Sequence, residues 1–377
     1  MLYFSHMKIL LAAGIFPPDI GGPATYAQML DEELPKVGID VTVVPYGLVR
    51  SKPKAIRHIA YVWLLLKAAY GCSVIYALDP MSVGVPSRIV AFLTRKKLVV
   101  RLGGDYAWEQ GVQRYGVTDT LDEYTAHHSV RPLPVRLMAW LQTFVVRGAR
   151  VVIVPSNYMQ GIVSSWGIPP QKIRVMYSAL HPLAPLDDRK ILREDFLFTG
   201  LVISSVARLT PWKGMKSLID VVALRTRRGE IITLVIGGDG PERQALEQYA
   251  KTLGMSDHVR FVGALTRDAM AAVVYASDIF ILNTAYEGLS HQLLEVMDIG
   301  TPIITTNIGG NPELITNGVE GIFVPVNDVQ AIDVAISKIT LTPDLANELV
   351  KAAKNRVTFF KSNTIIEEMR LVFTSLR

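Results

Sequence analysis

The chain has 377 residues, of which 50% are hydrophobic and 19% are charged. The length favours two domains, and the composition excludes a disordered, collagen-like or coiled-coil protein. Cys72 is the only cysteine, which excludes an internal disulfide and a metal site built on several thiolates, so we expect a reducing cytoplasmic compartment.

Positive charge is concentrated in the first half. Residues 1–181 contain 19 Lys/Arg and 11 Asp/Glu, whereas residues 182–377 contain 20 and 23, so the halves carry +8 and −3. This excess predicts an anionic partner such as a membrane surface, with a solvated basic face as the alternative. Nucleic acid ranks last, because no basic stretch is interleaved with stacking aromatics.

Short β-branched runs alternate with helical patterns along the whole chain, which predicts parallel sheets with ligands at the carboxyl ends of the strands. The first of these runs, at residues 9–13, is too short for a signal peptide, and we interpret it as a buried strand. Prolines and a run of charged residues near positions 181–194 mark a domain boundary. We expect an N-terminal Rossmann-like domain (1–185) and a C-terminal one (186–377), and the last helix of the chain can return to the N-terminal domain. The expected strands are residues 8–12, 41–45, 74–77, 98–102 and 151–154, then 201–206, 232–236, 259–262, 279–282, 302–305 and 321–324.

An apolar stretch at residues 59–78 contains Lys67 as its only charge. We reject a membrane span because Gly71 interrupts it, and we expect a helix over residues 55–70 followed by a buried strand. Residues 63–66 make the second half of this helix apolar nearly all round, so it is either buried in the core, the commoner case, or inserted shallowly into a bilayer surface. Cations that could bind an anionic bilayer stand at or before its start: Arg50, Lys52, Lys54 and Arg57.

Two cations follow a buried strand in the second half, within SVARLTPWKG at residues 205–214. The guanidinium of Arg208 can bind a phosphate through two hydrogen bonds, and Lys213 adds a point charge. This pair predicts a site for a diphosphate, with ordinary surface cations as the alternative while the pair is taken alone.

Residues 279–300 read as a strand, a loop and a helix, and they place Glu287 and Glu295 eight positions apart. Helical side chains lean toward the N-terminus, so Glu295 is expected near the ligand that Glu287 contacts. Gly288, Leu289 and Ser290 offer backbone N–H groups at the helix start, where an anion binds well. Residues 302–313 add a further strand and a Gly-Gly turn.

In order and spacing, these motifs resemble the GT-B glycosyltransferases of family four, the retaining, nucleotide-sugar-dependent glycosyl transferases group 1. The similarity covers nearly the whole chain. The resemblance implies an α/β fold of GT-B architecture, with two Rossmann-like domains whose parallel sheets face a central cleft. The elements that carry it are Glu-x7-Glu at 287–295, ARLTPWKG at 207–214, GGDGPE at 237–242 and PPDIGGPATY at 17–26.

The resemblance also implies roles for individual residues. Arg208 and Lys213 would bind the donor diphosphate, and Glu287 would position the sugar through its hydroxyls. Gly288, Leu289 and Ser290 would give backbone contacts, and Glu295 would hold the ribose. Gly21 and Gly22 would let the N-terminal loop approach the donor phosphates closely, since they carry no Cβ.

The chain departs from the family pattern after the fourth strand of the first domain, where many members carry a histidine facing the sugar. Asp105 is our catalytic substitute there, and a helix cap is the alternative for this residue. The Asn-Gly pair usual after the last strand of that domain is also absent, since VMYSAL stands at residues 175–180. His127, His128, His181 and His291 lack metal-ligand spacing and receive no role.

The resemblance implies a hexosyltransferase that moves a sugar from a nucleoside-diphosphate sugar to a hydroxyl acceptor, without a metal or another cofactor. We expect a glycan or lipid-linked acceptor in cell-surface polysaccharide or glycolipid synthesis, met in the cytoplasm or at the inner face of the cell membrane. A GT-B nucleotide-sugar epimerase and an inactive nucleotide-sugar-binding module remain open. A Rossmann oxidoreductase is excluded, because residues 14–22 do not match G-x-G-x-x-G.

Overall fold

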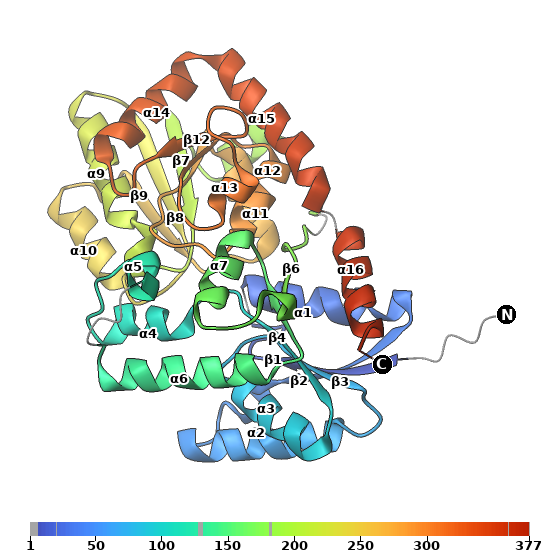
Figure 1. Cartoon of the computed structure of the whole chain (residues 1–377). Coiled ribbons are helices and arrows are strands. Elements are labelled where there is room, and N and C mark those ends of the chain that lie inside the picture. Colours follow the sequence, from blue (N-terminus) through green and yellow to red (C-terminus); the bar gives the residue numbers. More distant parts are fainter. Residues whose placement is uncertain (1–6, 20, 127–130, 181–182, 361, 377) are drawn as a thin grey trace. The chain divides into compact units, whose positions relative to one another are not determined.

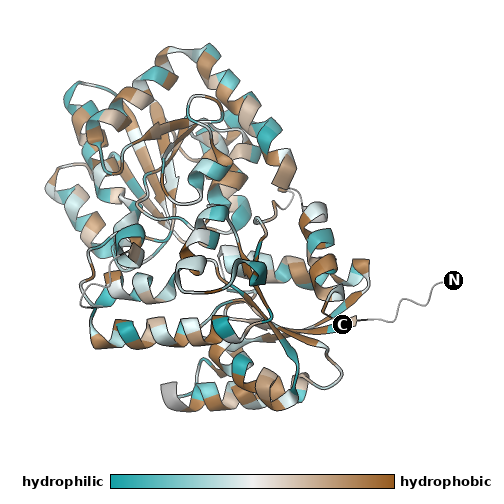
Figure 2. Cartoon of the chain, in the orientation of Figure 1, coloured by the Kyte–Doolittle hydropathy of each residue, from teal (hydrophilic) through white to brown (hydrophobic). Residues whose placement is uncertain are grey.

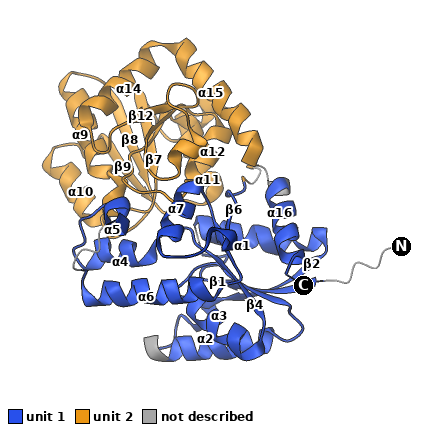
Figure 3. Cartoon of the chain, viewed as in Figure 1, with its two compact units in different colours: residues 1–179, 362–377 blue, residues 180–361 orange. Residues whose placement is uncertain are grey.

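The computed structural model describes residues 7–19, 21–126, 131–180, 183–360 and 362–376. The chain forms two compact units, Met1–Ala179 with Ser362–Arg377, and Leu180–Lys361 (Figures 1 and 3). We refer to them as unit 1 and unit 2 and describe each by itself.

Unit 1 contains a six-stranded parallel sheet in the order β2-β1-β3-β4-β5-β6. Its central strands are nearly continuous apolar runs, because helices cover both faces of the sheet. In the register, Ile9 of β1 lies opposite Val41 on one side and Val74 on the other. The strands are β1 (Met7–Ala13), β2 (Ile39–Pro45), β3 (Val74–Ala77), β4 (Lys97–Arg101), β5 (Val151–Val154) and β6 (Ile173–Val175).

The helices of unit 1 include one from the far end of the sequence. Helix α16 (Ser362–Thr374) places Met369 and Phe373 in the same core as Met29 and Tyr76. The rings of Tyr76 and Phe373 meet edge to face, 5.5 Å apart. The other α-helices of unit 1 are α1 (Gly22–Glu33), α2 (Lys54–Ala68), α3 (Gly84–Thr94), α4 (Tyr106–Arg114), α5 (Leu121–Ala126), α6 (Leu133–Gly148) and α7 (Asn157–Ser165).

Unit 2 contains a second six-stranded parallel sheet, in the order β12-β11-β10-β7-β8-β9, and its strands are largely hydrophobic (Figure 2). The strands are β7 (Leu201–Val206), β8 (Ile232–Gly237), β9 (Val259–Gly263), β10 (Ile279–Leu282), β11 (Ile303–Thr306) and β12 (Ile322–Val324). The helices are α8 (Arg189–Asp195), α9 (Met215–Arg227), α10 (Arg243–Thr252), α11 (Arg267–Ala276), α12 (His291–Ile299), α13 (Asn311–Leu314), α14 (Val329–Leu341) and α15 (Pro343–Val357).

The α/β fold class predicted from the sequence is confirmed by these two parallel sheets with their helices. Every expected strand is present within two residues of its expected ends. Strand β6 had no expected range, because its three residues are too few to show a periodic pattern.

Helix α2 is the helix expected over residues 55–70. It buries Leu65 but leaves Trp63 60% exposed, so the expectation of core burial for residues 63–66 is wrong for Trp63. Arg50, one of the cations named for a bilayer contact, forms a bidentate ion pair with Asp19, 2.9 Å at each oxygen, so part of its charge is balanced within the chain. None of the described helices is both long enough and apolar enough to pass through a bilayer.

Candidate active site

The loops that follow neighbouring strands of unit 2 meet at one edge of its sheet, because the carboxyl ends of parallel strands lie together. Backbone hydrogen bonds tie these loops to one another. The Leu209 N–H, after β7, donates to the Asp239 carbonyl after β8 (2.9 Å), and the Ala285 N–H, after β10, donates to the Trp212 carbonyl (2.8 Å). The loops therefore form one connected platform.

Lys213 and Glu287 form an ion pair on this platform, although 74 positions separate them. Lys213 ends a short 3-10 helix after β7, and Glu287 lies in the loop after β10. Their side chains are 11% and 14% exposed, so water screens the pair weakly. Beside them, the rings of Trp212 and Tyr286 meet edge to face at 6.2 Å and connect the same two loops.

Two asparagines that the sequence analysis missed fix the loop that carries Lys213. The Asn283 side chain donates to the Gly214 carbonyl (2.9 Å) and to Oδ1 of Asn327 (3.0 Å), and the Asn327 N–H donates back to Asn283 (3.0 Å). Gly214 has φ 53°, and a Cβ there would lie 2.4 Å from the Asn283 side chain. The available sequence signal was Asn283, an asparagine directly after a strand that is expected to be buried. A buried side-chain amide needs hydrogen-bond partners.

The Gly-Gly turn after β11 holds the Glu287 loop from the other side. The Gly310 N–H donates to the Glu287 carbonyl (3.0 Å). A Cβ at Gly309 would lie 2.0 Å from the Glu287 carbonyl oxygen, and one at Gly310 would lie 2.3 Å from the Gly288 carbonyl oxygen. Only glycine fits these two positions without a backbone shift.

Arg208 stands one residue beyond the buried Ala207 and is exposed. Within the part of the chain that the structure describes, it makes no ion pair, so its charge is available to a ligand. Ser290 caps helix α12 by accepting a hydrogen bond from the Leu293 N–H (3.2 Å), directly after Gly288 and Leu289. The backbone N–H groups that we predict to bind an anion thus stand at the start of a capped helix, directly after Glu287 in the sequence.

Glu295 lies on α12 and pairs with Arg267 of α11, with 2.8 Å between the carboxylate Oε1 and the guanidinium Nε. Burial raises the pKa of Glu295, while the hydrogen bond and charge of Arg267 lower it. Sequence reasoning missed Arg267, because a cation at the start of a neighbouring helix carries no local signal of its partner.

The remaining candidates belong to unit 1. Gly21 precedes α1 with φ 141°, and Gly22 is the first residue of that helix. Asp105 is 1% exposed and caps α4: its Oδ1 accepts from the Trp108 N–H (3.0 Å) and from the Gln142 amide (2.9 Å). These contacts are those of a helix cap, which is the alternative that the sequence left open for Asp105. The burial of its carboxylate does not favour the predicted catalytic role.

Of the four histidines without a role, His127, His128 and His181 lie outside the described residues, and His291 begins α12. Among the residues that the structure describes, no three His, Cys, Asp or Glu side chains are grouped so that they could hold a metal ion.

Comparison with protein families accounts for both units. The family described as "Glycosyl transferases group 1" matches residues 188–356, and the "Glycosyl transferase 4-like domain" matches residues 22–179. The chain belongs to the group 1 glycosyltransferases. The family that the sequence predicted is thereby confirmed.

Curated relatives of this glycosyltransferase are distant. The alpha-D-kanosaminyltransferase of Streptomyces kanamyceticus is 25% identical over 63% of this chain and 59% of its own length. A GDP-mannose-dependent alpha-(1-6)-phosphatidylinositol monomannoside mannosyltransferase of Mycobacterium tuberculosis is 30% identical over 41% of this chain. The chain spans 42% of the length of that enzyme.

Solved structures share the fold of this glycosyltransferase over nearly its whole length. HepE of Anabaena, in complex with UDP-glucose, aligns with a TM-score of 0.77 at 19% identity and covers 98% of this chain and 100% of its own. Sucrose-phosphate synthase from Thermosynechococcus elongatus aligns with the same TM-score over 98% of this chain and 99% of its own. The predicted GT-B fold is confirmed by these likenesses.

The Arg267–Glu295 pair leads to a prediction about pH. If Glu295 accepts hydrogen bonds from ribose hydroxyls, it must be ionised, so nucleotide affinity should fall as the pH drops through its raised pKa. Replacing Arg267 with methionine removes a cause that lowers this pKa, so the fall should begin at a higher pH than in the unmodified chain. Calorimetric titration of a nucleoside diphosphate across pH measures this. A fall that does not move, or moves to lower pH, would contradict the role of Arg267, and Glu295→Gln should remove this pH dependence.

Proposed function

We propose that the chain is a retaining hexosyltransferase, which transfers a sugar from a nucleoside-diphosphate sugar to a hydroxyl of a glycan or a lipid-linked acceptor. The acceptor would belong to cell-surface polysaccharide or glycolipid synthesis, in the cytoplasm at the inner face of the cell membrane. The observation that carries the proposal is the shielded Lys213–Glu287 pair at the carboxyl edge of a parallel sheet, with the exposed Arg208 in the same loop as Lys213.

The chemistry of the leaving group supports this proposal. Departure of a nucleoside diphosphate puts negative charge on the leaving oxygen, and fixed cations stabilise that charge as it develops. Arg208 and Lys213 would supply the two cations. The N-terminus of α12 would add the partial positive charge of a helix dipole, which stabilises a nearby anion. HepE was solved with UDP-glucose, and the mycobacterial relative is named as GDP-mannose-dependent, which supports a nucleotide-sugar donor here.

Glu287 would act as a positioning group for the sugar. Its carboxylate is held by Lys213 and its carbonyl by the Gly310 N–H, so its orientation is fixed before a donor binds. In the proposed retaining reaction the acceptor attacks from the face that the leaving group vacates, and a phosphate oxygen of the donor takes the acceptor proton. No side chain then forms a covalent bond to the sugar.

The test is incubation of the purified chain with a panel of UDP- and GDP-sugars, with and without glycan and lipid-linked acceptors. Acceptor-dependent release of the nucleoside diphosphate, with a product of the same anomeric configuration as the donor, is the expected result. Release accompanied by an epimerised free sugar would favour the epimerase instead. Binding of donors without release under any condition would favour the inactive binding module.

We also expect transfer to be independent of divalent metal, because Arg208 and Lys213 would supply two cations to the diphosphate in the proposed site. A chelator should leave the rate of the purified enzyme unchanged, as measured by nucleoside diphosphate release. Loss of activity that only a divalent ion restores would contradict this prediction.

A further inference from the structure

Helices α2, α3 and α6 pack side by side over one face of the unit 1 sheet. Each buries one stripe of apolar residues, such as Leu65 on α2, Val90 on α3 and Val145 on α6. Each also exposes a second apolar stripe on its outer side. We call the exposed apolar residues of these three helices the outer face; its largest members include Ile59, Trp63, Phe92, Leu133, Trp140 and Phe144.

The outer face follows helical spacing along α6. Leu133, Leu137, Trp140 and Phe144 are separated by three or four positions and so lie on one side of the helix. Trp140 and Phe144 stack with their ring centroids 5.6 Å apart and their planes 16° apart, and Trp140 is 61% exposed. Scattered exposed side chains are common on a soluble surface, but a contiguous set with aromatic rings marks an interaction site.

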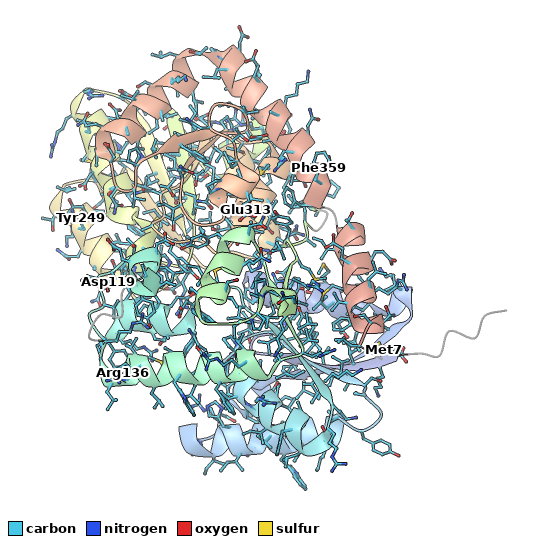
Figure 4. The ribbon with its side chains drawn as sticks, in the orientation of Figure 1. Met7, Asp119, Arg136, Tyr249, Glu313 and Phe359 are labelled. Carbon is cyan, nitrogen blue, oxygen red and sulfur yellow. The ribbon has the colours of Figure 1, made fainter. Side chains whose placement is uncertain are left out.

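The charge on these helices is of one sign. Helices α2, α3 and α6 contain no Asp or Glu. A second copy of the chain docked on this face would bring like charges together, whereas an anionic surface would complement them. The cations on the three helices are Lys54, Arg57, Lys67, Arg88, Arg136 (labelled in Figure 4) and Arg147.

Arg88 and Arg147 line a pocket of about 220 Å³ within this face, together with Trp140 and Phe144. The Arg88 guanidinium lies over the Phe144 ring at 5.6 Å and packs on Gly148, where a Cβ would be 2.0 Å from its Nε. That Nε is buried without a hydrogen-bond partner, and Arg88 makes no ion pair with any residue that the structure describes. The buried Nε cannot reach a ligand, but its burial holds the guanidinium in place, and the terminal N–H groups can donate to an oxyanion.

We propose that the outer face docks on an anionic phospholipid bilayer and that the Arg88–Arg147 pocket holds a lipid phosphate. Trp63, Trp140 and Phe144 would insert at the depth of the headgroups, where amphipathic aromatic rings are stable. The cations would add an attraction that salt screens. Membrane docking itself does not depend on the proposed function. Only its purpose does: docking would bring a lipid-linked acceptor to unit 1 if the chain is the proposed transferase.

The experiment is sedimentation of the full chain with vesicles of phosphatidylcholine alone, and of phosphatidylcholine mixed with phosphatidylglycerol. We expect binding to the mixed vesicles that weakens with salt, and much weaker binding to the neutral ones. Because each cation near such a surface contributes about 1 kcal/mol, Arg147→Gln should lower the partition coefficient about fivefold, and Arg88→Gln with Arg147→Gln about thirtyfold. The double variant Trp140→Ser/Phe144→Ser should also lose binding to the mixed vesicles.

Matched controls lie in unit 2. Phe359→Ser removes an aromatic side chain that is 74% exposed (Figure 4), and Lys251→Gln removes an exposed cation from α10. Both should bind as the unmodified chain does. Arg88 is half-buried, so circular dichroism must show that the Arg88→Gln/Arg147→Gln variant is folded. If it is unfolded, the single variant at the exposed Arg147 provides the test.

Three results would overturn the proposal: no binding to the mixed vesicles, equal binding to both kinds of vesicle, or binding that the pocket and aromatic variants leave unchanged. Self-association that Trp140→Ser/Phe144→Ser removes, without vesicle binding, would assign the outer face to a second copy and would also overturn it. Because binding is measured without turnover, its failure is distinct from a failure of the proposed transferase activity.

Discussion

Replacing Lys213 with methionine is expected to lower kcat by about a hundredfold or more while the chain stays folded, because the charge that forms on the leaving diphosphate loses a fixed, water-shielded cation. Arg208→Met should have an effect of similar size. Both variants keep an apolar stem of similar length, so packing changes little. The measurement is nucleoside diphosphate release at saturating donor.

Lys216 provides the matched control for Lys213. It is a lysine three positions further along, 63% exposed, in a surface ion pair with Asp220. Lys216→Met should retain a nearly normal rate, since exposed pairs of this kind contribute little. A folded Lys213→Met or Arg208→Met variant with a normal kcat would contradict the assigned roles.

Lys213→Met also leaves the Glu287 carboxylate without its partner in a weakly screened position, so part of the loss could come from a displaced Glu287. A double-mutant cycle with Glu287→Gln separates the two effects. If Lys213 acts directly on the diphosphate, Lys213→Met should still reduce the rate strongly when Glu287 is already glutamine.

Gly309→Ala is expected to abolish most donor binding and turnover. The new Cβ would lie 2.0 Å from the Glu287 carbonyl oxygen, so the loop that carries Glu287 must shift. A displacement of about 1 Å at a reacting site can cost about a hundredfold in rate. Gly309 also has φ 60°, which costs a residue with a Cβ about 1–2 kcal/mol in the free energy of unfolding.

Gly318→Ala is the control for backbone strain alone. Gly318 has φ 77°, and a Cβ there would meet nothing within 4 Å. It should lose about 1–2 kcal/mol of stability in a denaturant titration while its donor affinity and rate stay unchanged. A Gly309→Ala variant that binds and turns over donor like Gly318→Ala would show that the turn does not position Glu287.

Local sequence patterns predicted the strands well, because a strand covered on both faces is a continuous apolar run. The same patterns could not predict side-chain pairing across long separations. Arg50 is a candidate cation for a bilayer contact by sequence alone, whereas the fold brings Asp19 to it from 31 positions away. Trp63 was expected in the core because the helix is apolar nearly all round, and composition alone does not tell which side of such a helix meets the sheet.

The candidate site was predicted in part. The positions of Arg208, Lys213, Glu287 and Glu295 came from motif order and family resemblance, and their roles stay predictions. The partners of Asn283, Asn327 and Arg267 could not be predicted, since each contact joins segments that are far apart in the sequence and that only the fold brings together.

The return of α16 to unit 1 has a consequence for the order in which the protein can be made. Met29 and Tyr76 share their core with Met369 and Phe373, which the ribosome adds only after all of unit 2. Unit 2 consists of one uninterrupted segment and can close its own core while translation continues. Synthesis of unit 1 therefore starts before that of unit 2 and ends after it, so the apolar surface that α16 covers stays uncovered while unit 2 is made.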